Sequence, residues 1–330
     1  MKVLVTGATG FLGSHLASAL AARGDTVRAL SRGIVGESRR QEANIEIVRG
    51  DLKDKDSLRE AIAGVDVVCH AAAAMRGSWR EHAETTIQGT KWMLKLSQEA
   101  GVKRFIHISS ITIYRTWDRE SKALIDETCP WDPYPERLGP YAYSKVEAEK
   151  HAFRYLWQGL PVVVIRPGII YGPGGRVMHP NVGYFVTKKL FLLVGGGDIP
   201  LPLTYVDNTV DGILLAMSND RAIGQVYNLV DDATITQREF LDRYKTSVNG
   251  RFVTLSLPLP LLLAGAVLAR QLKRFGMTSI VTTAYGLNAQ YANVRFDAGK
   301  ARRELGWHPR VALDEGLRCT FSGSSPRHRP

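Results

Sequence analysis

The chain has 330 residues, with 43 Lys and Arg against 32 Asp and Glu, a formal net charge of +11, and 45% hydrophobic residues. These proportions are typical of a globular protein and exclude an intrinsically disordered chain, a collagen-like repeat and a disulfide-rich scaffold. The length allows two packed units, or one large core with a smaller addition.

Cysteine usage and the first residues indicate the compartment. Cys69, Cys129 and Cys319 are odd in number, widely spaced and without a Cys-x-x-Cys pair, which favours a reducing environment. The segment from Met1 to Thr6 runs directly into a glycine-rich turn and does not have the pattern of a signal peptide. We therefore expect a cytoplasmic protein.

The basic residues are unevenly distributed. Residues 251–330 contain twelve Lys and Arg against four Asp and Glu, so +8 of the net +11 lies in the last quarter of the chain. Nucleic-acid binding would require these cations on one stripe with interleaved aromatic residues, but they fall in separate segments, so we interpret them as solvated helix faces and expect no nucleic-acid partner.

Over the first half of the chain, short β-branched runs alternate with helical stretches. The predicted strands are 2–6, 26–30, 45–49, 65–70, 105–109 and 162–166, and the predicted helices are 11–23, 57–62, 86–100 and 140–158. Such alternation predicts an α/β fold of Rossmann type, a doubly wound parallel sheet with helices on both faces. We assign residues 1–166 to this dinucleotide-binding domain.

After Arg166 the alternation gives way to loops rich in Gly and Pro, so residues 167–330 are predicted to form mainly a smaller, interleaved α/β substrate domain. Its predicted elements are helices at 207–217, 237–248 and 297–305 and a strand at 226–230. We expect the segment 206–230 to return to the Rossmann core, and the tail from 323 to 330 to fray.

The strongest local motif follows the first strand and opens the first helix. It reads Thr6-Gly7-Ala8-Thr9-Gly10-Phe11-Leu12-Gly13. Gly7 permits a tight turn, Gly10 lets the backbone approach a pyrophosphate, and Gly13 lets helix and strand pack closely. The motif in this context predicts dinucleotide binding.

The end of the second strand bears on which dinucleotide is bound. An acidic residue there would accept hydrogen bonds from the adenosine ribose, but this chain has Ser31 and Arg32. Arg32 can pair with a phosphate dianion and Ser31 can donate to it, so NADP(H) is favoured. NAD(H) is the alternative, in which Arg32 is a solvated loop residue beside a permissive site.

Two groups suited to proton transfer lie near the start of a predicted helix. Tyr141 and Lys145 are four residues apart and so project from one face. The ordinary pKa of a tyrosine is about 10, and an adjacent ammonium favours its phenolate. Ser110, after the strand 105–109, lies at the carboxyl edge of the sheet and can hold a substrate oxygen; its alternative role is to cap a turn. Tyr143 is interpreted as a packing residue.

These motifs together resemble the extended short-chain dehydrogenase/reductase superfamily, of the NAD-dependent epimerase/dehydratase type, over nearly the whole chain. Further matching segments are Asp51-Leu52, His70-Ala71-Ala72-Ala73, Arg166 to Pro173, Tyr205 to Asn208, Tyr227 to Leu229, Phe296 to Lys300 and Leu305 to Trp307. The resemblance implies catalysis by Ser110, Tyr141 and Lys145, and no metal. It implies a cofactor site made of Gly7, Thr9, Gly10, Phe11, Leu12, Gly13, Ser31, Arg32, Asp51, Leu52, Ala71, Ala72, Ala73, Ser109, Tyr141, Lys145, Pro167, Gly168 and Ile170.

Two positions depart from the family pattern. Thr86 stands where an Asn often precedes x-x-Gly-Thr, and Arg115 follows Tyr114 where Gly is usual. Both put in doubt the geometry of the substrate loop and any proton relay through that helix, while the fold is unaffected.

The substrate class is narrowed by what the motifs lack. Dehydratases of the family carry Asp-Glu after the catalytic hydroxyl, where this chain has Ile111-Thr112, and epimerases usually carry an Arg-Asp pair that the segment 199–208 lacks. The sequence looks closest to the branch of 3β-hydroxysteroid dehydrogenases and ketoreductases, which implies a largely apolar ketone or alcohol. A nucleotide-sugar epimerase and a non-catalytic NADP-binding regulator remain as alternatives.

A last segment is open to three interpretations. The apolar stretch 255–272 can cover an apolar substrate, form an ordinary buried helix or, because Arg270, Lys273 and Arg274 lie beside it, rest on an anionic membrane through residues 255–274. Proline and hydroxyl residues interrupt the run 252–269, so we expect no transmembrane helix. The family also implies a homodimer through the helices 86–100 and 140–158.

Overall fold

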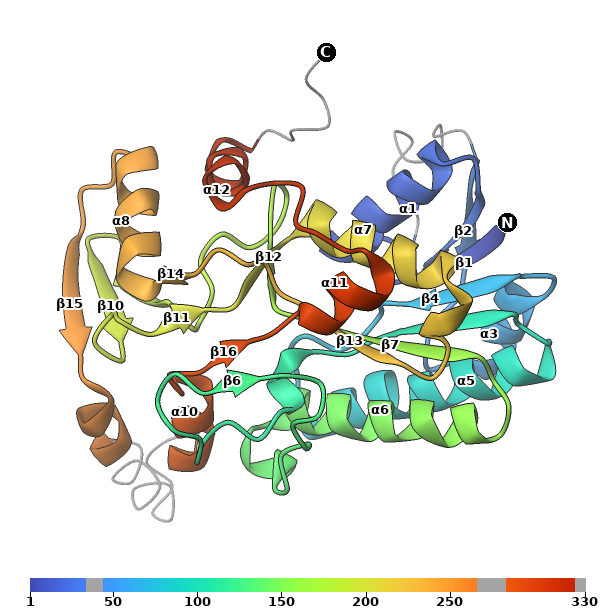
Figure 1. Cartoon of the computed structure of the whole chain (residues 1–330), viewed down its shortest axis with the longest axis horizontal. Coiled ribbons are helices and arrows are strands. Elements are labelled where there is room, and N and C mark those ends of the chain that lie inside the picture. Colours follow the sequence, from blue (N-terminus) through green and yellow to red (C-terminus); the bar gives the residue numbers. More distant parts are fainter. Residues whose placement is uncertain (34–43, 266–282, 324–330) are drawn as a thin grey trace.

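The computed structural model describes residues 1–33, 44–265 and 283–323 (Figure 1). A seven-stranded parallel sheet runs through one half of the molecule, in the order β13-β7-β5-β4-β1-β2-β3. Its strands are β1 (Lys2–Thr6), β2 (Thr26–Ser31), β3 (Ile45–Arg49), β4 (Val67–His70), β5 (Arg104–Ile108), β7 (Val162–Pro167) and β13 (Val226–Leu229). The predicted Rossmann-type α/β fold is confirmed.

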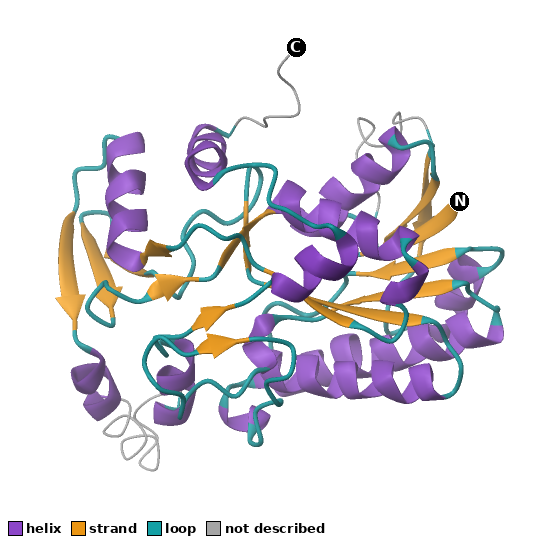
Figure 2. Ribbon diagram, in the orientation of Figure 1, coloured by secondary structure: helices purple, strands orange, loops and turns teal. Residues whose placement is uncertain are grey.

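Helices cover both faces of this sheet, which is why every residue of β4, β5 and β7 is buried. One face packs against α1 (Phe11–Ala22), α7 (Val206–Ser218) and α11 (Gly299–Leu305). The other packs against α3 (Lys55–Ile62), α5 (Gly89–Glu99) and α6 (Pro140–Trp157). Figure 2 shows these layers on either side of the strands.

The chain crosses between the two halves of the molecule several times. Strand β13 pairs in parallel with β7 although about sixty residues separate them, and β12 (Leu203–Tyr205) leads directly into α7. The division at residue 166 stays a prediction.

The other half contains a three-stranded sheet, β15-β10-β9, made of β9 (Gly183–Thr187), β10 (Leu190–Val194) and β15 (Val253–Leu257). The helices of this half include α8 (Gln237–Ser247), α10 (Ala284–Gln290) and α12 (Leu313–Ser322). Two-stranded pairs join it to the rest: β8 (Ile169–Tyr171) with β12, β11 (Pro200–Leu201) with β14 (Ile235–Thr236), and β6 (Leu124–Ile125) with β16 (Arg295–Phe296).

Two elements differ from the prediction. The helix expected from residue 86 is continuous with α4 (Trp79–His82) and a π-helical turn, Ala83–Gln88, before α5 begins. The interpretation of 255–272 as one buried helix is wrong for its first residues, because Val253, Leu255 and Leu257 alternate with hydroxyl residues and form a strand. Residues 259–265 are helical, and 266–272 lie outside the described residues.

Within the described ranges no helix is long and apolar enough to cross a membrane.

Candidate active site

The glycine loop between β1 and α1 has the shape of a phosphate cradle. Gly7 has a φ of +70°, and a Cβ on it would lie 3.0 Å from the backbone of Ala72; a Cβ on Gly13 would lie 2.1 Å from the Gly7 carbonyl oxygen. Gly10 caps α1 without a side chain, so the first N–H groups of the helix face the loop. A helix start of this kind binds a pyrophosphate, so the residues present fit a dinucleotide. Thr9 is exposed, and Phe11 and Leu12 are half-buried.

The segment Ala71–Ala73, which follows β4, is held beside this loop by buried hydroxyls. The Thr6 hydroxyl accepts from the Ala72 N–H at 3.1 Å and bonds to His70 Nδ1 at 2.8 Å, while His70 Nε2 lies 3.0 Å from the Thr90 hydroxyl. Burial lowers the pKa of His70 to about 3, so its ring is neutral at pH 7. The three alanines are partly exposed, and the backbone of Ala71 and Ala72 lies against Gly7 of the loop.

The adenosine end of the predicted site is at the ends of β2 and β3. Ser31 is buried and its hydroxyl donates to the Gly33 carbonyl at 3.0 Å, whereas Arg32 is exposed. Asp51 accepts from the Lys53 N–H at 3.0 Å, and Leu52 packs where a Cβ on Gly89 would lie 2.7 Å away. Of the two residues predicted to hold a 2′-phosphate, Arg32 is therefore the one that faces solvent.

The structure brings the three predicted reacting groups together. Tyr141 and Lys145 lie in the first two turns of α6, which starts at Pro140, and Ser110 follows β5. The Ser110 side chain lies near enough to the Tyr141 phenol to lower its pKa. It also accepts from the Thr112 N–H at 3.2 Å, so Ser110 caps the turn 111–113 as well.

The charges of this group are set mainly by burial. Burial raises the pKa of Tyr141, and the Ser110 hydroxyl lowers it. Burial lowers the pKa of Lys145 to about 8, while the negative charge of Glu149 raises it. Lys145 Nζ donates to the Ile108 carbonyl at 2.8 Å, which uses one of its three N–H donors.

A buried ion pair that the sequence did not reveal lies one turn beyond Lys145. Glu149 is 0% exposed and forms an ion pair with Arg166 of β7, and it also accepts from Trp131 Nε1 at 2.8 Å. Arg166 donates in turn to the Tyr114 hydroxyl at 2.8 Å. The spacing of four residues between Tyr141, Lys145 and Glu149 is the signal that places all three on one helix face.

Another buried residue near Tyr141 that the sequence analysis did not single out is His82, at the end of α4. It is 2% exposed, its ring lies edge-on to Tyr141 at 6.3 Å between centroids, and Nδ1 lies 3.2 Å from the Ser144 hydroxyl. Because that hydroxyl donates to the Tyr141 carbonyl at 2.8 Å, Nδ1 is the donor toward it. Burial lowers the pKa of His82. The residue therefore packs as a neutral ring against the helix that carries Tyr141.

The two departures from the family pattern have local partners. The Thr86 hydroxyl, in the π-helical turn, accepts from the Ala74 N–H at 2.9 Å and so fixes the end of the alanine segment. Arg115 forms an ion pair with Asp118. Tyr143, interpreted as a packing residue, lies edge-on to Trp79 at 5.6 Å.

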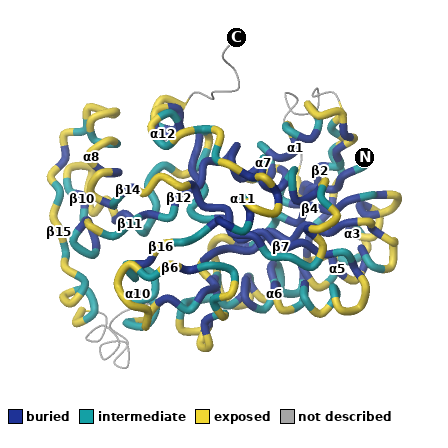
Figure 3. The backbone as a smooth tube through the Cα atoms, in the orientation of Figure 1, coloured by how far each residue is buried: buried dark blue, intermediate teal, exposed yellow. Residues whose placement is uncertain are grey.

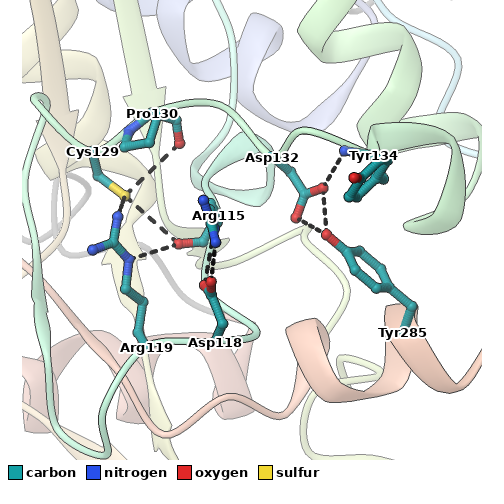
Figure 4. A network of polar contacts seen from close by, with 8 residues as sticks. All are labelled: Arg115, Asp118, Arg119, Cys129, Pro130, Asp132, Tyr134 and Tyr285. Atoms are coloured by element: carbon teal, nitrogen blue, oxygen red, sulfur yellow. Dashed lines mark hydrogen bonds and ion pairs between the residues drawn. The ribbon is translucent and has the colours of Figure 1, made fainter.

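Helix α10 is fastened to the loop that precedes α6. Figure 4 shows the Tyr285 hydroxyl, from α10, donating to both carboxylate oxygens of Asp132 at 2.7 and 2.9 Å. The Thr283 hydroxyl donates to the Arg137 carbonyl at 2.7 Å. At its other end α10 packs Leu287, with the following Tyr291, against Val194 of β10. This helix thus connects the three-stranded sheet with the residues just before Tyr141.

The remaining predicted residues lie at the ends of β5 and β7. Ser109 is buried, and its hydroxyl has no hydrogen-bond partner among the described residues. Pro167 ends β7, and a Cβ on Gly168 would lie 2.3 Å from the Pro202 carbonyl oxygen. Ile170 lies in β8, paired with Thr204. Over the described part of the chain, no three His, Cys, Asp or Glu side chains are grouped to hold a metal.

Known proteins resemble this chain over most of its length. Residues 3–229 match the NAD dependent epimerase/dehydratase family. The chain is 30% identical over 321 residues to 4-hydroxy-2-methyl-3-oxo-4-farnesyl-3,4-dihydroquinoline-1-oxide ketoreductase from Stigmatella aurantiaca, covering 96% of this chain and 95% of that protein. It is 28% identical to a 3 beta-hydroxysteroid dehydrogenase/Delta 5-->4-isomerase of Mycobacterium tuberculosis, covering 96% and 88%. The crystal structure of UDP-glucuronic acid 4-epimerase from Bacillus cereus in complex with NAD superposes with a TM-score of 0.77 at 22% identity, covering 98% of each chain.

Proposed function

Since this chain belongs to the NAD dependent epimerase/dehydratase family, whose members include dehydrogenases, reductases and epimerases, we propose that it interconverts a largely apolar ketone and its secondary alcohol. The observation that carries the proposal is the grouping of Ser110, whose hydroxyl lowers the pKa of the Tyr141 phenol, with Tyr141 and, one turn away, Lys145, beside a glycine cradle for the cofactor. A hydroxyl pair beside a buried ammonium is suited to holding and protonating a carbonyl oxygen.

Each residue has a role in the direction of reduction. Ser110 donates a hydrogen bond to the substrate oxygen, and Tyr141 gives that oxygen its proton as the carbinol forms. Lys145 keeps its bond to Ile108 and uses its remaining N–H donors to hold the nicotinamide ribose. A nicotinamide cofactor supplies the hydride when bound, and NADP(H) is favoured because Arg32 is exposed at the end of β2.

The apolar substrate class is supported by the relatives and by the segment before α7. The named substrates of the ketoreductase and of the hydroxysteroid dehydrogenase are a farnesylated ring system and a steroid. Residues 199–206 contain no charged side chain that would bind a diphosphate. A small molecule with an apolar body is therefore the proposed substrate.

A nucleotide-sugar epimerase is the second candidate, favoured by the structural similarity to UDP-glucuronic acid 4-epimerase. Such an enzyme returns the hydride to its product and shows no net cofactor turnover. A non-catalytic regulator is the third candidate, and Ser110, Tyr141 and Lys145 would then be unused.

The test is turnover by the purified chain. It is incubated with NADPH or NADP and with panels of apolar ketones, hydroxysteroids and nucleotide sugars, and the absorbance of the reduced nicotinamide is followed. We expect turnover with an apolar carbonyl or alcohol, reduced by about a hundredfold to ten-thousandfold in Tyr141→Phe and retained in the control Tyr143→Phe. Epimerised nucleotide sugar without net turnover would assign the second candidate instead.

We further propose a homodimer through α5 and α6. Trp157, the last residue of α6, is 84% exposed, and a partner helix would cover it. Sedimentation velocity at micromolar concentration tests this proposal, and a monomer there contradicts it.

A further inference from the structure

Exposed apolar side chains gather at the end of the molecule away from the seven-stranded sheet. Of fifteen large hydrophobic residues exposed in the described part of the chain, six lie in the segments 184–186 and 253–261. We call these six the outer patch: Tyr184, Phe185, Val186, Val253, Leu255 and Leu261. Figure 3 shows the exposed backbone of β15 at this end.

The strand register places Tyr184, Val253 and Leu255 on one face, whereas Phe185 lies opposite Phe191 on the other. Leu192 of β10 lies opposite Tyr184 on one side and Leu255 on the other, so these three side chains form a row across the sheet. Leu190 lies opposite Val253 two residues away, which places a second row beside the first. Val253 is 68% exposed and Leu255 is 55% exposed.

The same face is partly covered by a helical turn. Residues 259–265 are helical, and Leu259, Leu262 and Leu263 pack into the cluster that contains Leu192. Leu261 is not part of that cluster and is 61% exposed. The part of the face around Leu192 that the helical turn covers thus adjoins the part around Tyr184 and Leu255 that stays exposed.

Both edges of this sheet contribute to the patch, since β9 and β15 are its outer strands. Exposed apolar edge strands promote unwanted pairing with other chains unless something covers them. Patches of this kind on a protein surface mark interaction sites.

The charged residues within the segments that carry the outer patch are all positive. Segments 182–194 and 248–265, which contain it, include Lys188, Lys189 and Arg251 and no Asp or Glu. Lys188 and Lys189 lie in the turn between β9 and β10, and the Val253 N–H donates to the Lys189 carbonyl at 2.9 Å. Arg251 thus lies near the same end of the sheet as the two lysines.

We propose that the outer patch docks this protein on an anionic membrane surface. Its aliphatic and aromatic side chains enter the boundary between headgroups and acyl chains, and the three cations face lipid phosphates. Segments that combine exposed apolar residues with cations and contain no acidic residue match an anionic lipid surface better than the mixed charges of a typical protein partner. The inference goes beyond the proposed reaction and does not depend on it.

The experiment is co-sedimentation of the whole chain with vesicles. Phosphatidylcholine vesicles with and without phosphatidylglycerol are compared at low and at high salt. We expect binding to the anionic vesicles at low salt, and a marked decrease at high salt, because salt screens the cations. Failure to bind anionic vesicles at low salt would overturn the proposal.

Variants separate the two contributions. Val253→Glu with Leu255→Glu is expected to abolish binding, and Lys188→Glu with Lys189→Glu to weaken it by about thirtyfold or more. The matched controls, on distant exposed positions, are Leu124→Glu for the apolar change and Lys103→Glu with Arg303→Glu for the charge change. Unaltered circular dichroism and NADPH binding show that the variants fold.

Two other results would also overturn the proposal. One is equal vesicle binding by the Val253→Glu, Leu255→Glu variant and the wild type. The other is self-association of the wild type that this variant abolishes, without any vesicle binding, since the patch would then contact a second copy of the chain.

Discussion

Two regions of the molecule depart from the usual burial of apolar side chains and exposure of charged ones. At α6 charged side chains are buried, and on the three-stranded sheet apolar side chains are exposed. Glu149 and Arg166 are charged and buried, at 0% and 3% exposure, whereas Val253 and Leu255 are apolar and more than half exposed. Ordinary packing favours neither arrangement. The first region is fixed by hydrogen bonds and an ion pair among its own side chains, at the helix that carries Tyr141 and Lys145. The second exposes apolar side chains to water, which suits it to the membrane contact proposed above.

The buried ion pair provides the largest effect on stability. Glu149→Gln leaves the Arg166 guanidinium buried without its counter-ion, so we expect the free energy of unfolding to fall by about 3–5 kcal/mol. Urea unfolding measures the change. Glu147→Gln is the control on the same helix, because Glu147 pairs with Lys150 at the surface and is expected to matter by less than about 1 kcal/mol. Equal losses of unfolding free energy in Glu149→Gln and Glu147→Gln would mean that the buried ion pair stabilises the fold no more than a surface ion pair does.

The buried carboxyl of Asp231, which follows β13 of the seven-stranded sheet, makes the stability of the folded chain depend on pH. It accepts from the Tyr205 N–H at 2.9 Å and from Asn208 Nδ2 at 3.1 Å, yet burial raises its pKa to about 7. Between its ordinary pKa of 3.8 and 7, the folded chain binds a proton that the unfolded chain releases. The contribution of this group to stability is therefore present below pH 3.8 and lost as the pH rises toward 7.

Asp231→Asn isolates that contribution. We expect the variant to gain up to about 4 kcal/mol of stability relative to wild type as the pH is raised from 4 to 8, measured by urea unfolding at each pH. Asp232→Asn is the matched control, because Asp232 is exposed and pairs with Arg302. A constant difference between Asp231→Asn and wild type would refute the pH dependence.

A substitution of Arg32 tests the proposed adenosine end of the cofactor site, at the end of β2. Arg32→Ala removes a charged donor from the proposed 2′-phosphate site, so the ratio of NADPH to NADH affinity is expected to fall by about tenfold to a hundredfold. Fluorescence titration with both cofactors measures it. Arg28→Ala, which removes a side chain on the same strand paired with Glu46, should leave the ratio unchanged. An unaltered ratio in Arg32→Ala would assign that residue to solvent.

The smallest expected effect concerns the outer patch. Leu255→Ala is expected to change the free energy of unfolding by less than about 0.5 kcal/mol, because the side chain is already exposed. Leu193→Ala, in the adjacent strand and 0% exposed, should cost about 2–5 kcal/mol. Similar losses in the two variants would show that Leu255 is covered in solution, and would remove the contrast between the two regions.

The seven-stranded sheet and the glycine loop could be predicted because each is encoded locally, by β-branched runs and by glycines that no other residue can replace. Tyr141 and Lys145 were predictable from one helical spacing. The pairing of Glu149 with Arg166, and of Asp132 with Tyr285 across 153 residues, depends on chain crossings that no local period reveals. Strand β15 was not predicted because its residues run into the apolar stretch that follows and were read with it as one segment. The alternation of Val253, Leu255 and Leu257 with hydroxyl residues was the signal of a strand.

Helix α10 has a thermodynamic consequence, because it touches both regions. Tyr285 holds Asp132 shortly before the helix of Tyr141, and Leu287 packs in the cluster that includes Leu192 of the outer sheet face. If a ligand at one end shifted α10, it would change the free energy of binding at the other end. By reciprocity the factor would be the same in both directions, so substrate at the proposed reaction site would change the proposed membrane attachment as much as attachment changes substrate affinity.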